Sequence, residues 1–110
     1  MTLRRASPNS SGAMVALDYE VAQEQASALG RAGRALEQAL QALSDHDRSA
    51  TEDKTPRAEL VQEAGHALWC FMVQREAIGL RDPRPVLRDY RVPPEVQNRM
   101  GVVVGGRRRC

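Results

Sequence analysis

The sequence predicts an all-α protein, a long antiparallel helical hairpin followed by a short, proline-punctuated C-terminal helical cap. Three observations favour this fold. The 110 residues include only four aromatic side chains and are rich in residues that favour helices. Apolar residues recur at spacings of three and four, the period of an amphipathic helix. A chain of this length forms one domain. We expect a disordered tail over residues 1–12, one helical domain over 13–101 and a flexible basic tail over 102–110.

The first helix is predicted from Ala13 to Leu43, because this stretch contains no proline and its apolar residues follow a heptad pattern typical of coiled coils. Ser10 and Ser11 are candidate N-caps. The apolar stripe consists of Val15, Tyr19, Ala22, Ala26, Leu29, Gly33, Leu36, Leu40 and Leu43. Small residues in its middle predict the close approach of another backbone there. A kink or break between Gly30 and Gly33 is the alternative.

The second helix is predicted from Pro56 to about Ile78, after a polar loop over Ser44–Thr55. Thr55 is expected to cap its first turn, and Pro56 suits the first helical position. Gly79 is expected to end it in the left-handed conformation, with Leu80 folding back on the last turn. Its apolar face comprises Leu60, Val61, Ala64, Leu68, Phe71, Met72 and Ile78.

Two helices alone cannot bury both apolar stripes. The remaining chain offers Val86, Leu87, Val92, Val96 and Met100 for packing on the hairpin. The alternative is dimerisation into a four-helix bundle. The sequence therefore predicts either a C-terminal cap or a second copy over the open side.

Several classes of protein are disfavoured by composition. No uncharged stretch approaches the roughly 20 apolar residues that span a bilayer, and no apolar stretch suits a signal peptide. Cys70 lies in an apolar run and Cys110 ends the chain, so we expect no disulfide between them, a reducing compartment and a cytoplasmic location. We found no nucleophile set and no glycine-rich phosphate loop. We therefore expect no enzyme activity and no cofactor.

The function that this pattern favours is protein interaction, as a homo-oligomer or with a helical protein partner. Hydrophobic burial along the exposed remainder of the seam would drive it. The residues assigned to this interaction seam are Ala22, Ala26, Leu29, Gly33, Leu36, Leu40, Leu43, Leu68, Phe71 and Met72.

A nucleic-acid-binding regulator is the first alternative. From Leu80 onward the chain has eight arginines against three acidic residues, which suits contacts with phosphate groups. The segment from Leu87 to Arg99 has the pattern of a helix-turn-helix, which is a short helix, a turn and a second helix with polar side chains. Two departures count against it: Arg91 holds the turn position usually given to glycine, and Val96 falls one residue early. The candidate contacts are Arg81, Arg84, Arg88, Arg91 and Arg99.

A dimeric metal protein is the second alternative. Glu63 and His66 have the Glu-x-x-His spacing of di-iron helical bundles, and Cys70 lies one turn further on. However, Glu63 and His66 lie opposite the apolar seam, and the first helix offers no glutamate within it. A polar surface patch is the simpler interpretation.

The run from Phe71 to Gly101, FMVQREAIGLRDPRPVLRDYRVPPEVQNRMG, with the helical lead from about Tyr19, resembles a family of short uncharacterised alphaproteobacterial proteins. Gln74-Arg75-Glu76 and Gly79-Leu80-Arg81-Asp82 are its most distinctive parts. The resemblance implies a bacterial cytoplasmic protein and assigns no activity or site.

Overall fold

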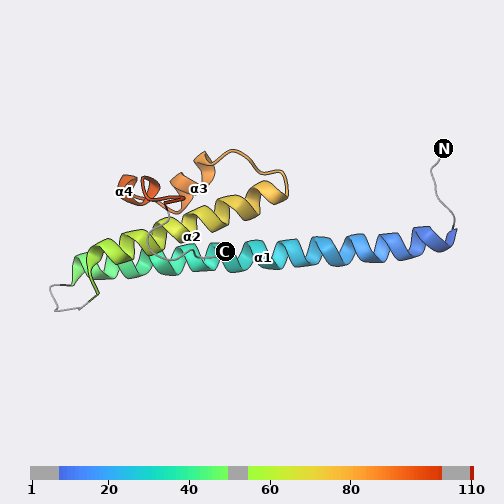
Figure 1. Cartoon of the computed structure of the whole chain (residues 1–110), viewed down its shortest axis with the longest axis horizontal. Coiled ribbons are helices and arrows are strands. Elements are labelled where there is room, and N and C mark those ends of the chain that lie inside the picture. The colour runs from blue at the N-terminus through green and yellow to red at the C-terminus, as the bar shows by residue number, and fades with distance from the viewer. Residues whose placement is uncertain (1–7, 50–54, 103–109) are drawn as a thin grey trace.

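The protein is a helical hairpin with a C-terminal cap, as the computed structural model in Figure 1 shows. The structure describes residues 8–49, 55–102 and 110, with side chains from residue 12 onward. Its elements are α1 (Pro8–Arg48), α2 (Arg57–Ala77), α3 (Arg84–Asp89) and α4 (Pro94–Gln97). The described residues form no strand, so the predicted all-α class is confirmed.

Helix α1 is longer at both ends than the predicted 13–43. It begins at Pro8, so Ser10 and Ser11 lie inside the helix and are not its N-caps. It continues to Arg48 through the segment assigned to the loop, because polar residues there bond to one another: Gln41 Nε2 donates to Asp45 Oδ1 at 2.9 Å, and Arg48 pairs with Asp45. The 41 residues run without interruption through Gly30 and Gly33, so the alternative of a break is wrong.

The start of α2 differs from the expected capping. Pro56, and not Thr55, occupies the N-cap position, with an extended backbone and no side-chain cap hydrogen bond of its own.

The backbone at the end of α2 is as predicted, although the Leu80 side chain is 46% exposed. Gly79 has a φ of +91°, and its N–H donates to Glu76 O at 3.0 Å. The N–H of Leu80 donates to Arg75 O at 2.9 Å. These two bonds define a Schellman motif, which ends the helix and turns the chain back over it.

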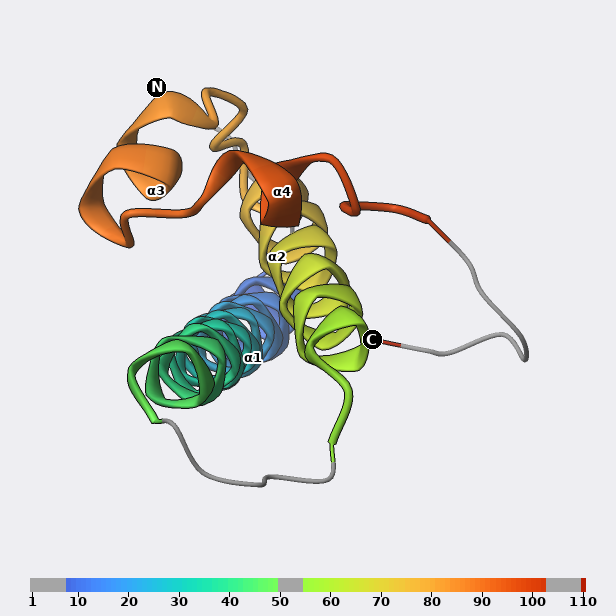
Figure 2. The ribbon, with the colours of Figure 1, turned by 90° about the vertical axis from the view of Figure 1, so that its left-hand side faces the viewer.

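The core lies where α2 covers the C-terminal half of α1 and where the cap covers α2. Leu36, Leu68 and Val96, one from each of α1, α2 and α4, are completely buried. Val86 and Val92 are buried beside them, and Leu87 and Met100 pack against this core, so the third element predicted from the sequence is confirmed. Figure 2 shows α4 lying over α2, with α3 to one side of it.

Two glycines mark close approaches in this core. A Cβ on Gly65 would lie 2.9 Å from the backbone C and O of Arg99, so the cap rests directly on α2 there. A Cβ on Gly33 would lie 3.1 Å from Tyr90 Oη and 3.4 Å from Phe71 Cε1. The small residue at position 33 therefore makes room for two aromatic side chains of the same chain, not for a second backbone as expected.

Candidate functional site

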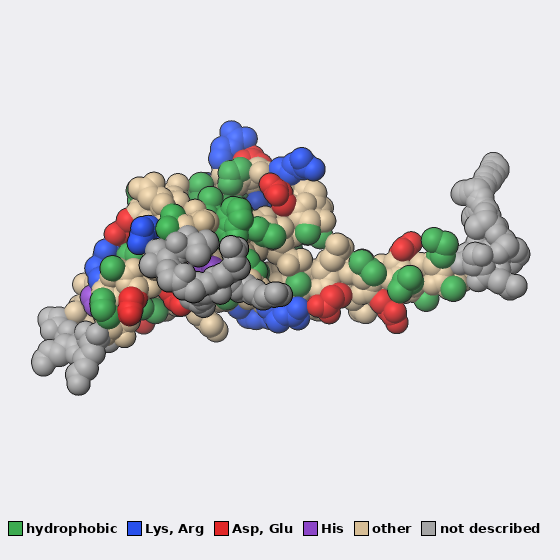
Figure 3. Space-filling view, in the orientation of Figure 1, with side chains coloured by type: hydrophobic (Ala, Val, Ile, Leu, Met, Phe, Trp, Pro, Cys, Tyr) green, Lys and Arg blue, Asp and Glu red, His purple; other side chains and the backbone are tan. Residues whose placement is uncertain are grey.

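Among the described residues, no other helix covers the N-terminal part of α1. We call residues 8–28 of α1 the arm; none of its described side chains is buried, and it projects beyond α2 in Figure 1. The heptad stripe continues along the arm as Val15, Tyr19, Ala22 and Ala26, which we call the arm stripe. Val15 is 67% exposed and Tyr19 is 64% exposed. Figure 3 shows apolar and acidic side chains along the arm, among other polar groups and backbone.

The ten residues assigned to the interaction seam therefore divide into two groups. Gly33, Leu36, Leu43, Leu68 and Phe71 are buried inside the chain, and Leu29, Leu40 and Met72 are partly buried against the same core. Only Ala22 and Ala26 are exposed. The sequence identified the right stripe on α1 but did not separate the part that α2 covers from the part that it leaves open.

The arm also has an uneven charge pattern. It carries Asp18, Glu20 and Glu24 and no basic residue between Ala13 and Gly30. The first arginine after it, Arg31, donates from Nη2 to Glu24 Oε2 at 3.0 Å, and both side chains are well exposed.

A second feature gathers three potential metal ligands on the side of α2. One ligand atom from each of His66, Cys70 and Cys110 lies within 4.8 Å of the other two. Cys70 and Cys110 form a disulfide with an S–S distance of 2.19 Å, so the expectation of no disulfide is wrong. The expectation of a reducing compartment rested on the absence of this disulfide, so it is no longer supported.

The disulfide could not be derived from local sequence because it joins residues 40 positions apart. It depends on the path of the chain after the cap, where Gln62 Nε2 donates to Val102 O at 2.9 Å and holds that segment beside α2. The predicted flexible tail lies mainly outside the described residues, but its last residue is fixed to α2. The even number of cysteines was the signal that could have suggested the pair.

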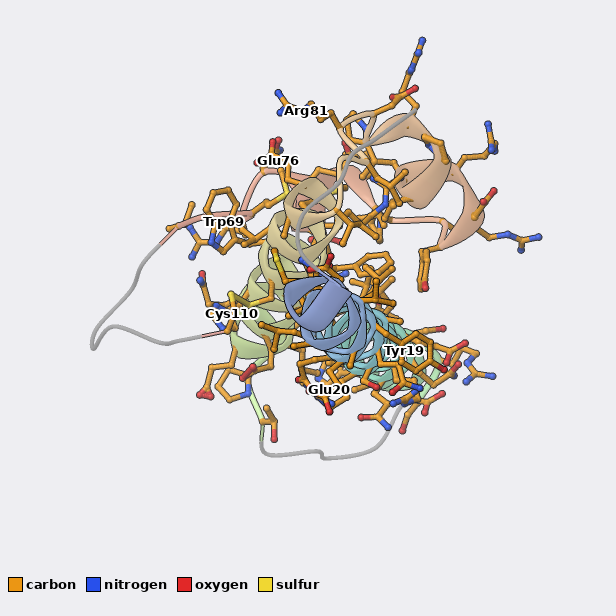
Figure 4. All side chains as sticks on the ribbon, turned by 90° about the vertical axis from the view of Figure 1, so that its right-hand side faces the viewer. Tyr19, Glu20, Trp69, Glu76, Arg81 and Cys110 are labelled. Atoms are coloured by element: carbon orange, nitrogen blue, oxygen red, sulfur yellow. A yellow bond between two sulfur atoms is a disulfide. The ribbon has the colours of Figure 1, made fainter. Side chains whose placement is uncertain are left out.

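His66 and Cys70 share one face of α2. The His66 Nε2 atom lies 3.5 Å from Cys70 Sγ, and both residues are half-buried. They line a groove of about 600 Å³ between α1 and α2, together with Ala28, Ala32 and Cys110. Glu63 lines the same groove but is outside the group of close ligand atoms. In Figure 4, Cys110 lies against α2 on the side away from Tyr19.

The cap carries the five arginines assigned to nucleic-acid contact. Arg81, Arg84, Arg88 and Arg91 are exposed and Arg99 is half-buried. Arg84 pairs with Asp82 at 2.9 Å, and this interaction lowers the pKa of Asp82 to about 2.

The segment taken for a helix-turn-helix has a short second helix. Helix α4 has four residues, and its Val96 is completely buried against α2. At the turn, Arg91 adopts a φ of +52°, the conformation for which glycine is usual. Its N–H donates to Arg88 O, and the N–H of Val92 donates to Leu87 O. Nucleic-acid binding stays a prediction.

An ionic cluster joins the end of α1 and the start of α2 to the cap. Arg57 donates to both carboxylate oxygens of Asp47, at 2.7 and 3.0 Å, and to both of Glu95, at 2.8 and 2.7 Å. These hydrogen bonds hold the pKa values of Asp47 and Glu95 below their usual range. The cluster lies at a groove of about 750 Å³ between α1 and the cap.

None of the described helices is long and apolar enough to cross a membrane. No curated protein and no solved structure matches the chain. The sequence model of DUF6665, a family of unknown function, matches residues 2–108. The chain therefore belongs to this family.

Proposed function

We propose that this member of DUF6665 is a self-association module, in which the arms of two copies pack antiparallel along the arm stripe. The observation that carries the proposal is the continuation of the α1–α2 seam beyond the end of α2. Helix α1 has 41 residues and α2 has 21, so about half of α1 keeps an apolar stripe that nothing in its own described chain covers. The proposed role includes no catalytic step.

The sizes of the stripe residues favour a second copy in antiparallel orientation. A two-fold axis between Glu20 and Val21 would place Tyr19 of one copy opposite Ala22 of the other. It would place Val15 opposite Ala26. Each layer would then combine one large and one small side chain, which fills space evenly. Parallel packing would instead place Tyr19 against Tyr19 and leave Ala22 against Ala22.

The same register keeps the acidic side chains apart. Asp18 and Gln25 both lie on the flank of the stripe, and the two-fold axis would bring Asp18 of one copy to Gln25 of the other. Glu20 and Glu24 lie on the opposite side of the helix from the stripe and would stay in water. An isologous pairing of this kind covers both arms at once, because the two uncovered stretches are equal in length.

The mass of the protein in solution tests the proposal, by analytical ultracentrifugation at several concentrations. We expect the wild-type chain to be a dimer. The double variant Ala22→Glu with Ala26→Glu should be a monomer, because it adds two charges to the arm stripe. The matched control is Gln23→Glu with Ser27→Glu, which adds the same charge one residue further along and outside the stripe. This control should remain a dimer.

Monomeric wild-type protein throughout the concentration range would overturn the proposal. Equal masses for the two double variants would also overturn it, because the effect would then come from charge and not from the stripe. Circular dichroism should show that both variants keep their helix content.

Orientation is tested separately by single lysine substitutions on the two flanks. In the antiparallel pairing Asp18 lies opposite residue 25 of the other copy, so Gln25→Lys should tighten the dimer. In a parallel coiled coil Asp18 would lie opposite residue 23, where Gln23→Lys would have this effect. Tightening by Gln23→Lys alone would contradict the antiparallel register.

A further inference from the structure

The group formed by His66, Cys70 and Cys110 has a chemistry that self-association does not use. We propose that the chain, when its disulfide is reduced, binds one thiophilic divalent cation such as Zn²⁺ through these three side chains. The inference rests on the distances within the group and does not depend on the proposed dimer.

Two of the ligands are already oriented by α2. His66 and Cys70 are four residues apart, so they lie one turn apart on the same face, with Nε2 and Sγ at 3.5 Å. Their neighbours Ala67 and Leu68 are buried in the core, which fixes this part of the helix. Two ligands at this helical spacing are a recurrent way of holding zinc.

The third ligand is at the end of the chain. Cys110 is exposed, and its sulfur already reaches Cys70. Two thiolates on one tetrahedral zinc ion lie about 3.8 Å apart, given Zn–S bonds of about 2.3 Å. Cys110 lies outside the four helices, so its sulfur can move by this small distance without displacing a helix.

The disulfide has to be reduced first, because a thiolate and not a disulfide sulfur is the metal ligand. A dithiol reductant supplies two electrons and two protons and becomes a disulfide itself. The bond between the Cys70 and Cys110 sulfurs breaks, and each sulfur becomes a thiol. Binding of Zn²⁺ then releases one proton from each thiol, so the metal is held by two thiolates and the neutral imidazole of His66.

The donor set favours a soft or borderline cation over a hard one. Two sulfurs and one imidazole suit Zn²⁺, whereas Mg²⁺ and Ca²⁺ prefer oxygen ligands. Because the group lines the groove of about 600 Å³, the fourth position would be open to water or to an added ligand. The redox state of Cys70 and Cys110 would therefore decide whether this site contains a disulfide or a bound metal ion.

The experiment uses the full chain in its oxidised and reduced forms. The protein is reduced with dithiothreitol, which is then removed without oxygen, and Zn²⁺ is titrated against a chromophoric chelator. We expect one Zn²⁺ per reduced chain and none per oxidised chain. Native mass spectrometry should show the mass of one zinc ion added and two protons lost. Mg²⁺ should not compete.

His66→Ala tests the ligand set, and His46→Ala is its matched control because His46 is the other histidine and lies near the far end of α1. We expect His66→Ala to weaken Zn²⁺ binding at least about tenfold and His46→Ala to leave it unchanged. With Co²⁺ in place of Zn²⁺, thiolate ligation should give a near-ultraviolet absorption band that Cys110→Ser weakens, because only the Cys70 thiolate then remains. Circular dichroism should confirm that each variant is folded.

Three results would overturn the inference. These are no Zn²⁺ binding by the reduced chain, equal binding by the two histidine variants, and one Zn²⁺ shared by two chains.

Discussion

The two halves of α1 carry the same heptad stripe and meet opposite surroundings. From Leu29 to Arg48 the stripe faces α2, and Leu36 is 0% exposed. In the arm the same stripe faces solvent, and Val15 is 67% exposed. The spacing of apolar residues along a helix thus shows which face is apolar. The length of the neighbouring helix determines how much of that face is buried.

The largest expected difference in the free energy of unfolding is between two variants of α1, each with one stripe residue shortened to alanine. Leu36→Ala should lower the free energy of unfolding by about 3 kcal/mol, because it leaves a cavity in the core. Val15→Ala should change it by less than about 0.5 kcal/mol in dilute, monomeric protein. Urea denaturation measures both. Similar losses for the two variants would show that the arm is buried in the isolated chain.

Two glycines of α1 and α2 give a second contrast. Gly65→Ala should lower the free energy of unfolding by about 2 kcal/mol, because its Cβ would meet the backbone of Arg99 at 2.9 Å. Gly30→Ala should raise it by about 0.5 kcal/mol, because alanine favours a helix and its Cβ meets only the end of the Arg34 side chain. Denaturation midpoints check both, and an unchanged Gly65→Ala midpoint would contradict the contact between the cap and α2.

Replacing Arg91, which lies in the cap between α3 and α4, should stabilise the cap. Arg91 has a φ of +52°, which a glycine adopts without strain. Arg91→Gly should therefore raise the free energy of unfolding by about 1 kcal/mol and leave the arm unaffected. Thermal unfolding measures the gain. A lower midpoint would mean that the Arg91 side chain stabilises the cap in a way that its backbone conformation does not reveal.

The smallest effect concerns the cluster around Arg57, and it depends on pH. The folded chain lowers the pKa values of Asp47 and Glu95, so their contribution to stability is present above the ordinary values of 3.8 and 4.5. It is lost as the pH falls through the lowered values. Arg57→Ala should reduce Tm at pH 7, and the difference from wild type should shrink as the pH is lowered from 4 to 2.

The control for this prediction is Arg88→Ala. Arg88 pairs only with its neighbour Asp89 among the described contacts, at 3.0 Å, and both side chains are well exposed. Its Tm difference from wild type should be small at every pH. An Arg57→Ala difference that stays constant down to pH 2 would contradict the assigned pairing.

Local signals in the sequence were sufficient to predict a helix end where neighbouring residues alone determine it. The glycine at position 79 ends α2 through two backbone hydrogen bonds within its own turn, and this could be predicted. The end of α1 could not, because Ser44 and Asp45 are as compatible with a helix as with a loop once Arg48 and Gln41 bond to Asp45.

The candidate sites depended on contacts between distant residues. The seam was found from periodicity, but the exposure of Ala22 and Ala26 follows from where α2 ends. The group of His66, Cys70 and Cys110 was missed as a group because Cys110 reaches α2 only through the path of the cap. Spacing alone suggested Glu63 and His66 together, and the structure brings Cys110 close to His66 as well.

Amide hydrogen exchange along α1, measured at a low and a high protein concentration, tests the central claim most directly. We predict that residues 29–48 are protected at both concentrations, whereas residues 13–27 become protected only at the high one. The Ala22→Glu and Ala26→Glu double variant should keep the arm unprotected throughout. An arm whose exchange is the same at both concentrations would contradict self-association through this stripe.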